Sequence, residues 1–257
     1  RNGGLYLTSI FRFPRLRSLI SAPMSRRYGW RFRELEAEIV RNSPALNITY
    51  TPRSFQVYAN EFPQSRYAFV GASIGGRRHE PFEPPAGRGS LVYISLGTEL
   101  NKSERFFRRC VAAFGSTGMR VVMAIGDSVR PESLGPVPHT MMVRRRVPQL
   151  EVLSRASLFI THGGMNSVNE ALFYGVPMLV VPVGNDQSTV ARRVEELGLG
   201  EALDIREATP DVLREVAMRV LSDRECHARL SAFRQETWNA GGNAKAAKLI
   251  IEHLNRV

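Results

Sequence analysis

Short apolar runs alternate with longer amphipathic segments along residues 91–198. The apolar runs consist almost entirely of Val, Leu, Ile and Met, as expected for strands of a parallel sheet that is buried on both faces. They predict strands at residues 91–97, 120–126, 139–147, 157–164 and 177–183. The amphipathic segments between them predict helices at residues 102–115, 148–156, 166–175 and 187–198. The predicted fold class is therefore α/β, with a doubly wound parallel sheet.

The carboxyl ends of these strands predict where a ligand would bind. Open α/β sheets bind their ligands in a crevice outside the carboxyl ends of the strands. We therefore expect one cleft that is lined by the loops after the strands. These loops follow Gly97, Gly126, Val147, His162 and Val183.

The two ends of the chain have a different pattern. After residue 198 we predict three more helices, at about 209–222, 224–239 and 243–255. Before residue 91 we predict a helix at 31–42 and two short strands, within 45–52 and 67–73. The stretch RRHEPFEPPAGRGS is rich in proline, glycine and charge, which predicts a linker. We predict an incomplete N-terminal domain at 1–76, this linker at 77–90, a ligand-binding domain at 91–242 and a C-terminal helix at 243–257.

The stretch FITHGGMNSVNEALFYGVP joins a predicted strand to a predicted helix through His162, Gly163 and Gly164. A helix start has unpaired backbone N–H groups and a partial positive charge, and glycine lets a ligand approach the backbone closely. These features predict an anion site, most often one for phosphate. Asn166 and Ser167 add side-chain donors on the first turn, and His162 could donate to a phosphate oxygen.

The same predicted helix carries a candidate acceptor group. Its apolar positions form a stripe that we expect to pack against the sheet, and Glu170 lies off this stripe, one turn from the phosphate end. The carboxylate of Glu170 is therefore placed to accept hydrogen bonds from ribose hydroxyls. A tight turn with a capping histidine and no ligand remains the alternative for the His-Gly-Gly motif taken alone.

Three other polar clusters also follow predicted strands. Asp186 and Gln187 suit the hydroxyls of a sugar, and they should open onto the same cleft. The turn SLGT at 95–98 can touch a phosphate. The basic cluster RRRVPQ at 144–149 either faces the cleft or is surface charge.

Composition narrows the function classes. The net charge of +11 leaves binding of a polyanion as an alternative, but the arginines are scattered and match no nucleic-acid-binding module, so we expect no nucleic-acid partner. No apolar run approaches the roughly 20 residues of a membrane span, so we expect no membrane anchor. Two distant cysteines, Cys110 and Cys226, form no disulfide framework, which is typical of a cytoplasmic protein.

The segment from VYISLGT to GGNAKAAKLIIEHL resembles the donor-binding half of glycosyltransferases that have the GT-B fold and use nucleotide sugars. V-P-Q, H-G-G-x-N-S, E-A, G-V-P and D-Q occur in the order of the UDP-glycosyltransferase superfamily, and most closely of its bacterial macrolide and antibiotic branch. The resemblance implies inverting transfer of a hexose from a UDP- or dTDP-linked donor to a hydroxyl of a small-molecule acceptor. It also implies that residues 1–76 are the tail of the acceptor-side domain.

The resemblance implies roles for residues at matching positions. The residues implied at the phosphates are Gly97, Thr98, His162, Gly164, Asn166 and Ser167. Val147 is implied at the base and Gln149 beside the nucleoside. Glu170 is implied at the ribose hydroxyls. Those implied at the donor sugar are Asp186 and Gln187. Arg146 departs from the family, which commonly has a base-stacking tryptophan there, although a guanidinium can also stack on a base.

The sequence also bears on mechanism. It contains no Asp-x-Asp pair, so we expect no metal ion and no cofactor, and the leaving nucleotide would be stabilised by His162 and the helix start. In the family the general base is a histidine of the N-terminal half, and none of His79, His139, His227 and His253 suits that role. We therefore expect the chain to bind a nucleotide sugar but to need the missing N-terminal half, or a separate subunit, for transfer.

Two other functions remain open at this stage. The chain could be a non-catalytic module that binds a nucleotide sugar, either as the donor subunit of a split glycosyltransferase or as a sensor. It could also be a related GT-B enzyme, such as a lipid-linked sugar transferase or a sugar epimerase, although these match the motif set less closely.

Overall fold

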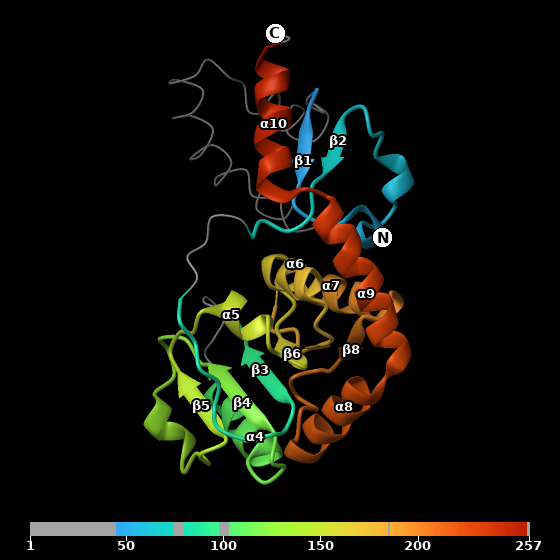
Figure 1. Cartoon of the computed structure of the whole chain (residues 1–257). Helices are drawn as coiled ribbons and strands as arrows, with labels where there is room; N and C mark the ends of the chain where they lie inside the picture. Colours follow the sequence, from blue (N-terminus) through green and yellow to red (C-terminus); the bar gives the residue numbers. More distant parts are fainter. Residues whose placement is uncertain (1–44, 75–79, 98–102, 185, 256–257) are drawn as a thin grey trace, which may run out of the picture. The chain divides into compact units, whose positions relative to one another are not determined.

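The computed structural model describes residues 45–74, 80–97, 103–184 and 186–255 (Figure 1). The chain divides into two compact units. The first includes residues 62–68 and the chain up to Ile48, of which 45–48 are described. Within it the backbone N–H of Asn47 donates to the carbonyl of Arg66 over 2.7 Å. The second unit consists of residues 49–61 and 69–257 and contains the large sheet.

Two short strands, β1 (Asn47–Thr49) and β2 (Tyr67–Phe69), form a small sheet of their own. Two single-turn helices lie between them, η1 (Arg53–Phe55) and η2 (Ala59–Glu61). The two predicted strands of this region are thus confirmed, although they are shorter than predicted. The predicted helix at 31–42 lies outside the described residues, as does the start of the predicted linker at 77–79.

The second unit is built on a parallel sheet of six strands in the order β5-β4-β3-β6-β7-β8. The strands are β3 (Leu91–Ser95), β4 (Arg120–Ala124), β5 (Met141–Arg144), β6 (Leu158–Thr161), β7 (Met178–Val180) and β8 (Gly200–Ala202). Every residue of β3, β6 and β7 is buried. This confirms the prediction from the continuous apolar runs, because a parallel strand between two helix layers has no solvent-facing side.

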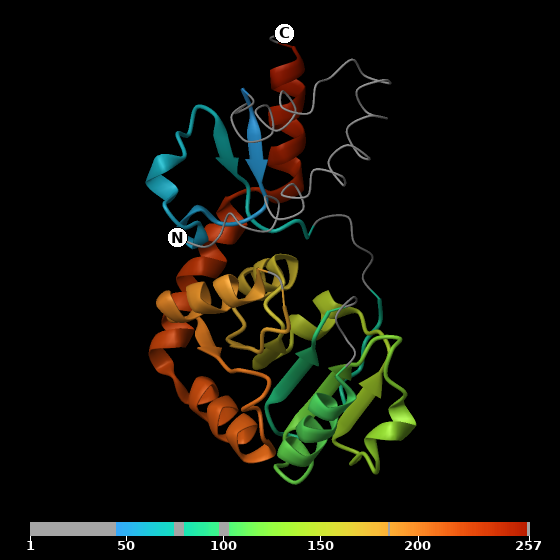
Figure 2. The ribbon, with the colours of Figure 1, turned by 180° about the vertical axis from the view of Figure 1, so that it is seen from behind.

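Two hydrophobic cores lie on the two faces of the sheet. One holds the side chains of Val92 and Ile94 together with α4 (Glu104–Phe114) and α8 (Pro210–Ser222). The other holds Tyr93, whose ring stacks on that of Phe159 with 4.8 Å between centroids. The helices of this second layer are α5 (Gln149–Leu153), α6 (Met165–Tyr174), α7 (Gln187–Glu196) and α9 (Arg224–Asn239). Figures 1 and 2 show the two layers from opposite sides.

Local sequence signals set several helix ends. Asp223 caps the start of α9, and its carboxylate accepts from the backbone N–H groups of Glu225 and Cys226 at 2.9 and 3.1 Å. α6 ends at Gly175, which has a left-handed backbone with φ of 71°, a conformation that glycine adopts without strain. The last helix, α10 (Gly242–Leu254), follows α9 directly.

The sequence prediction missed β8 and the single-turn helix η3 (Pro131–Leu134). The segment GEA has neither the length nor the apolar character of the other strands. It joins the sheet because Gly200 pairs closely with Met178, where a side chain would come within 1.9 Å of the Met178 carbonyl oxygen. The strand is therefore defined by contact with β7 and not by a periodic pattern. The predicted domain boundaries stay a prediction.

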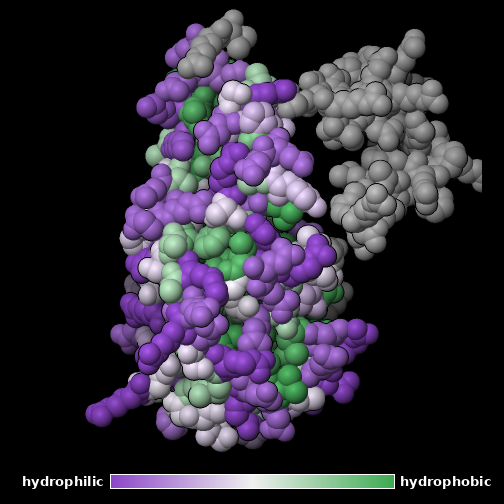
Figure 3. All heavy atoms as spheres, turned by 90° about the vertical axis from the view of Figure 1, so that its right-hand side faces the viewer, coloured by the Kyte–Doolittle hydropathy of each residue, from purple (hydrophilic) through white to green (hydrophobic). Residues whose placement is uncertain are grey.

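In the described part of the chain, no helix is both long enough and apolar enough to cross a bilayer. Figure 3 shows one side of the molecule, where hydrophilic residues predominate and hydrophobic ones form smaller areas between them.

Candidate functional site

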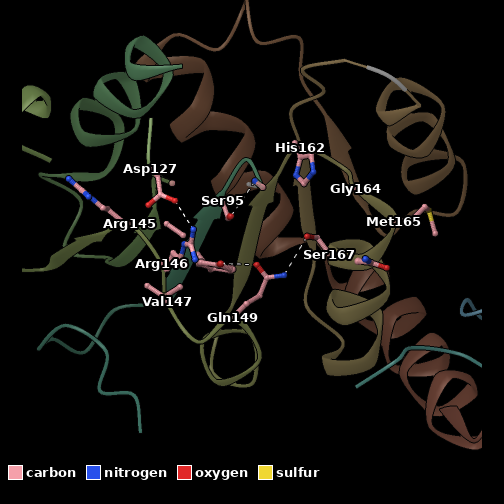
Figure 4. Close-up of a pocket in the computed structure, with 15 residues that line it drawn as sticks. Ser95, Asp127, Arg145, Arg146, Val147, Gln149, His162, Gly164, Met165 and Ser167 are labelled. Atoms are coloured by element: carbon pink, nitrogen blue, oxygen red, sulfur yellow. Dashed lines mark hydrogen bonds and ion pairs between the residues drawn. The ribbon is translucent and has the colours of Figure 1, made fainter. Parts of the chain in front are cut away.

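A cavity of about 470 Å³ opens at the carboxyl ends of the central strands (Figure 4). Its lining comes from the loops after β3, β4, β5 and β6 and from the first turn of α6. Four of the five predicted loops therefore meet in one cleft. The fifth loop, which follows β7, is not part of this lining. The lining residues are Tyr93, Ser95, Gly97, Ala124, Gly126, Asp127, Arg145, Arg146, Val147, Gln149, His162, Gly164, Met165, Asn166 and Ser167.

The imidazole of His162 is held between two glycines. A Cβ atom on Gly97 would lie 2.8 Å from the Cε1 atom of His162, and one on Gly164 would lie 2.5 Å from its Nε2 atom. Gly163 is required by the turn for two reasons. Its φ is +86°, and a Cβ atom on it would lie 2.7 Å from the side chain of Val180. Glycine at these three positions thus lets the His162 ring pack at the start of α6.

The environment of His162 favours a neutral imidazole. Burial lowers the pKa of His162 below its ordinary value of 6.5, and the carboxylate of Asp186 opposes this effect without cancelling it. The Nδ1 atom is buried and has no hydrogen-bond partner among the described residues. The ring stands next to Gly164, which caps α6 without a side-chain group. The first N–H groups of such a helix have no partner within the helix and carry partial positive charge.

Gln149 lines the cavity and is the centre of a hydrogen-bond network. Its amide oxygen accepts from the hydroxyl of Tyr93 at 2.9 Å. Its amide nitrogen donates to Ser167 at 3.4 Å and to a carboxylate oxygen of Glu170 at 2.5 Å. Glu170 is only 4% exposed and does not line the cavity. The carboxylate that the sequence assigned to ribose is therefore buried behind Gln149.

Basic side chains line the opposite wall. Arg146 reaches the carboxylate of Asp127 with 2.6 Å between nitrogen and oxygen, and both side chains are largely exposed (Figure 4). Arg145 and Val147 line the cavity beside this pair. The basic cluster after β5 thus faces the cleft through Arg145 and Arg146, while Arg144 is the exposed last residue of β5.

The predicted sugar-binding pair lies at the edge of this arrangement. Asp186 is exposed at the start of α7, close enough to His162 to affect its pKa. Gln187 is buried, and its amide oxygen accepts from the backbone N–H groups of Val183 and Gly184 at 2.8 and 3.1 Å. Neither residue lines the cavity. Thr98, which was predicted at the phosphates, lies outside the described residues.

Sequence reasoning missed several residues of the cavity wall. Tyr93, Ser95 and Ala124 belong to apolar strands and could only be found by noting that they end at the same edge of the sheet. Asp127 lies in a loop that was predicted to reach the cleft, so its position was available as a signal. The contacts of these residues with the predicted site residues depend on the order of the strands in the sheet and not on the local sequence.

The sequence model of the family described as erythromycin biosynthesis protein CIII-like, C-terminal domain, matches residues 108–252. The chain is 42% identical over 213 residues to the NDP-glycosyltransferase YjiC of Bacillus licheniformis, covering 81% of this chain and 53% of the relative. It is 38% identical over 213 residues to the oleandomycin glycosyltransferase of Streptomyces antibioticus, covering 82% and 50%. The crystal structure of the calicheamicin glycosyltransferase is similar with a TM-score of 0.82 and 32% identity, covering 95% of this chain and 62% of that one.

These similarities confirm the resemblance to bacterial nucleotide-sugar glycosyltransferases with the GT-B fold, of which the six-stranded sheet corresponds to the C-terminal, Rossmann-like half. The chain spans about half the length of the curated relatives that it matches. Because the family match covers more than half of its residues, the chain belongs to the family of erythromycin biosynthesis protein CIII-like C-terminal domains.

Proposed function

We propose that the cavity at the start of α6 binds the nucleotide diphosphate of a nucleotide sugar. We further propose that the protein transfers the hexose to a hydroxyl group of a small-molecule natural product. The observation that carries this proposal is the position of the His162 imidazole, which Gly97 and Gly164 hold at the start of α6 within the cavity. A helix start with adjacent glycines is suited to phosphate. The relatives, which are named as glycosyltransferases, support the same assignment.

Stabilisation of the leaving diphosphate would not need a metal ion. Asp127 is the one carboxylate among the described residues that line the cavity, and it is already paired with Arg146. The first-turn N–H groups of α6, the hydroxyl of Ser167 and an N–H of His162 are the donors on offer. Fixed donors of this kind stabilise developing negative charge without reorganisation during the reaction.

The other parts of the donor would occupy neighbouring residues. The base would lie against Arg146 and the backbone of Val147, with Gln149 beside the nucleoside. Glu170 would accept from ribose once Gln149 gives way. Asp186 would bind hydroxyls of the hexose, next to Gln187. UDP and dTDP donors both suit this arrangement.

The acceptor hydroxyl requires a general base on the face opposite the nucleotide, so that the sugar is transferred with inversion. Of the described histidines, His162 alone lines the cavity, and it belongs to the phosphate side. We propose that the base is supplied by an N-terminal acceptor domain or a separate subunit. In this view residues 1–76 belong to the acceptor-side domain, 91–242 form the donor-binding domain, and 77–90 and 243–257 are the linker and the C-terminal helix.

Calorimetric titration with UDP and dTDP in the presence of EDTA tests the donor site. We expect micromolar binding that does not change when Mg²⁺ replaces EDTA. Glu170→Ala should weaken UDP binding, whereas Glu132→Ala, at an exposed site outside the cavity, should not. A folded chain that binds neither nucleotide would contradict the proposed function.

Comparison of UDP with its deoxyribose analogue dUDP tests the role of Glu170 more sharply. If its carboxylate accepts from the ribose 2′-hydroxyl, Glu170→Ala should weaken UDP binding and leave dUDP binding nearly unchanged. An equal loss for both ligands would mean that Glu170 only positions Gln149. For transfer itself, we expect no glycoside when the chain alone is incubated with UDP-glucose and a phenolic acceptor, and efficient transfer would refute the need for a further domain.

A further inference from the structure

Tyr93 lines the cavity at the start of α6, at a position that packing in the core fixes. The residue is only 1% exposed. Its ring stacks on that of Phe159, with 4.8 Å between centroids and 7° between the ring planes. The two residues are opposite each other in the register of β3 and β6. Because side chains in such a close-packed core have little room to move, the Tyr93 hydroxyl occupies a fixed place at the cavity.

This hydroxyl group is a hydrogen-bond donor. It donates to the amide oxygen of Gln149 over 2.9 Å, and an amide oxygen can only accept. Burial raises the pKa of Tyr93 above its ordinary value of 10, and a side-chain hydrogen bond with Ser95 opposes this effect without cancelling it. The phenol therefore keeps its proton at neutral pH, and the hydrogen bond to Gln149 is retained.

The two ends of the Gln149 amide group have partners of different kinds. The amide nitrogen donates to Ser167 at 3.4 Å (Figure 4) and to Glu170 at 2.5 Å. In the proposed function, Ser167 and Glu170 are also the groups that a nucleotide would engage. The amide oxygen is held by Tyr93, whose ring belongs to the core. A bound nucleotide would therefore compete for the partners of the amide nitrogen and leave the hydrogen bond from Tyr93 in place.

We propose that Tyr93 is a positioning residue for the nucleoside, and that its hydroxyl anchors the amide oxygen of Gln149 both before and after the nucleotide binds. The amide N–H groups of Gln149 can then turn from Glu170 towards the nucleoside while the side chain stays in place. Tyr93 acts through Gln149 and needs no contact with the nucleotide itself. This inference rests on the proposed function, because the cavity must bind a nucleotide.

Calorimetric titration of Tyr93→Phe with three ligands tests this role. Phenylalanine keeps the ring stacked on Phe159 and removes only the hydroxyl group. In the free variant Glu170 still holds the amide of Gln149, whereas in the complex the amide loses its anchor. We therefore expect UDP and uridine to bind about fivefold more weakly, the usual effect of one hydrogen bond. Inorganic pyrophosphate has no nucleoside, so its affinity should be the same in the variant and the wild type.

Two more variants show whether the effect acts through Gln149. Gln149→Leu removes the amide group, so Tyr93→Phe should cost no further UDP affinity in that background. Tyr174→Phe is the matched control, because Tyr174 packs against the same core and does not line the cavity. It makes the same chemical change and should leave UDP binding as in the wild type. Thermal unfolding of each variant shows whether it is folded at the temperature of the titration.

The outcomes separate this inference from the proposed function. If the wild type binds UDP and Tyr93→Phe binds it equally well, the positioning role is overturned and the nucleotide site stands. A loss that persists in the Gln149→Leu background would overturn the role as well, because Tyr93 would then contact the nucleotide directly. A loss that extends to pyrophosphate would do the same, because it would indicate a general distortion of the cavity. A folded wild type that binds no UDP would refute the proposed function together with this inference.

Discussion

The steric fit of His162 between two glycines yields a sharp prediction for Gly164→Ala. The backbone of Gly164 has φ of −64° and ψ of 133°, which alanine adopts without strain. The added Cβ would lie 2.5 Å from the Nε2 atom of His162, whereas an ordinary contact begins at 3.4 Å. The imidazole must therefore move by roughly 0.9 Å, the difference between these distances. Overpacking of this kind destabilises proteins by about 1–3 kcal/mol.

This displacement should weaken nucleotide binding. If His162 donates to a phosphate oxygen, loss of that bond removes about 1.5–3 kcal/mol, since a bond to a charged group is stronger than a neutral one. We expect the affinity for UDP to fall roughly 10- to 100-fold. Calorimetric titration measures this loss, and thermal unfolding of the same variant measures its effect on stability. Gly135→Ala is the control, because Gly135 has φ of +80° with no atom within 4 Å of the added Cβ. It should lower stability and leave UDP binding unchanged.

A double-mutant cycle decides whether the effect acts through His162. His162→Ala removes the ring that the new methyl group would displace, so Gly164→Ala should then cost little further affinity. Coupling of this kind between contacting residues is measurable by comparing the single and double variants. An equal loss of UDP affinity with and without the imidazole would refute the reasoning. It would mean that Gly164 matters for the approach of phosphate to the backbone and not for the position of His162.

Three further predictions concern pH, the nucleobase and helix stability. Burial lowers the pKa of His162, so its ring is neutral in the free protein at pH 7.5, whereas a bound diphosphate raises this pKa. The affinity for UDP, measured by calorimetry, should therefore increase as the pH falls from about 7.5 to 6. His162→Gln should abolish this trend. Because the pKa of His162 is lower in the folded state, the unfolded chain binds a proton on this imidazole at a higher pH than the folded chain does. The contribution of neutral His162 to folding stability is therefore present above the ordinary pKa of 6.5 and is lost as the pH falls below it. Thermal unfolding of the wild type at several pH values should show this loss, and His162→Gln should not. Arg146→Ala should weaken UDP and dTDP binding about two- to fivefold, which is the usual effect of losing an exposed contact between a guanidinium and an aromatic ring, here the nucleobase. Unchanged affinity would mean that Arg146 only pairs with Asp127. Asp223→Ala removes the cap of α9 and should cost about 1 kcal/mol of folding free energy without any change in UDP affinity, as measured by denaturant unfolding beside titration.

The sequence was sufficient to predict the elements that carry a strong periodic or continuous pattern. The apolar runs that became β3 and β6 and the amphipathic segment of α4 are examples, and the turn from Thr161 into α6 was correctly expected at a cleft. β8 could not be predicted, because Gly200 enters the sheet through its fit against β7 and not through hydrophobicity. Local pattern fails where long-range contact decides the structure.

The partners of the site residues were hidden for the same reason. Tyr93 and Gln149 are 56 residues apart, and Gln149 and Glu170 are 21 apart, so their hydrogen bonds depend on the order of strands in the sheet. The prediction of Glu170 as a ribose acceptor rested on helix periodicity and on the resemblance to the family. Periodicity places a residue on one side of a helix, but it does not say that another polar side chain already occupies that side.

Gln149 therefore determines how a ribose could reach Glu170. Its amide nitrogen lies 3.4 Å from the hydroxyl oxygen of Ser167 and 2.5 Å from a carboxylate oxygen of Glu170, so both hydrogens of the amide group are directed to acceptors. A hydrogen bond to a charged acceptor is the stronger of such a pair, so an incoming hydroxyl should replace the contact with Ser167 first. At that stage ribose would be bound by Ser167 and the amide of Gln149. Glu170 would accept from ribose only after the second contact, between Gln149 and Glu170, also opens. If that second contact opens, Glu170→Ala should weaken UDP binding and leave dUDP binding nearly unchanged. If it stays closed, Glu170→Ala should weaken the binding of both ligands equally.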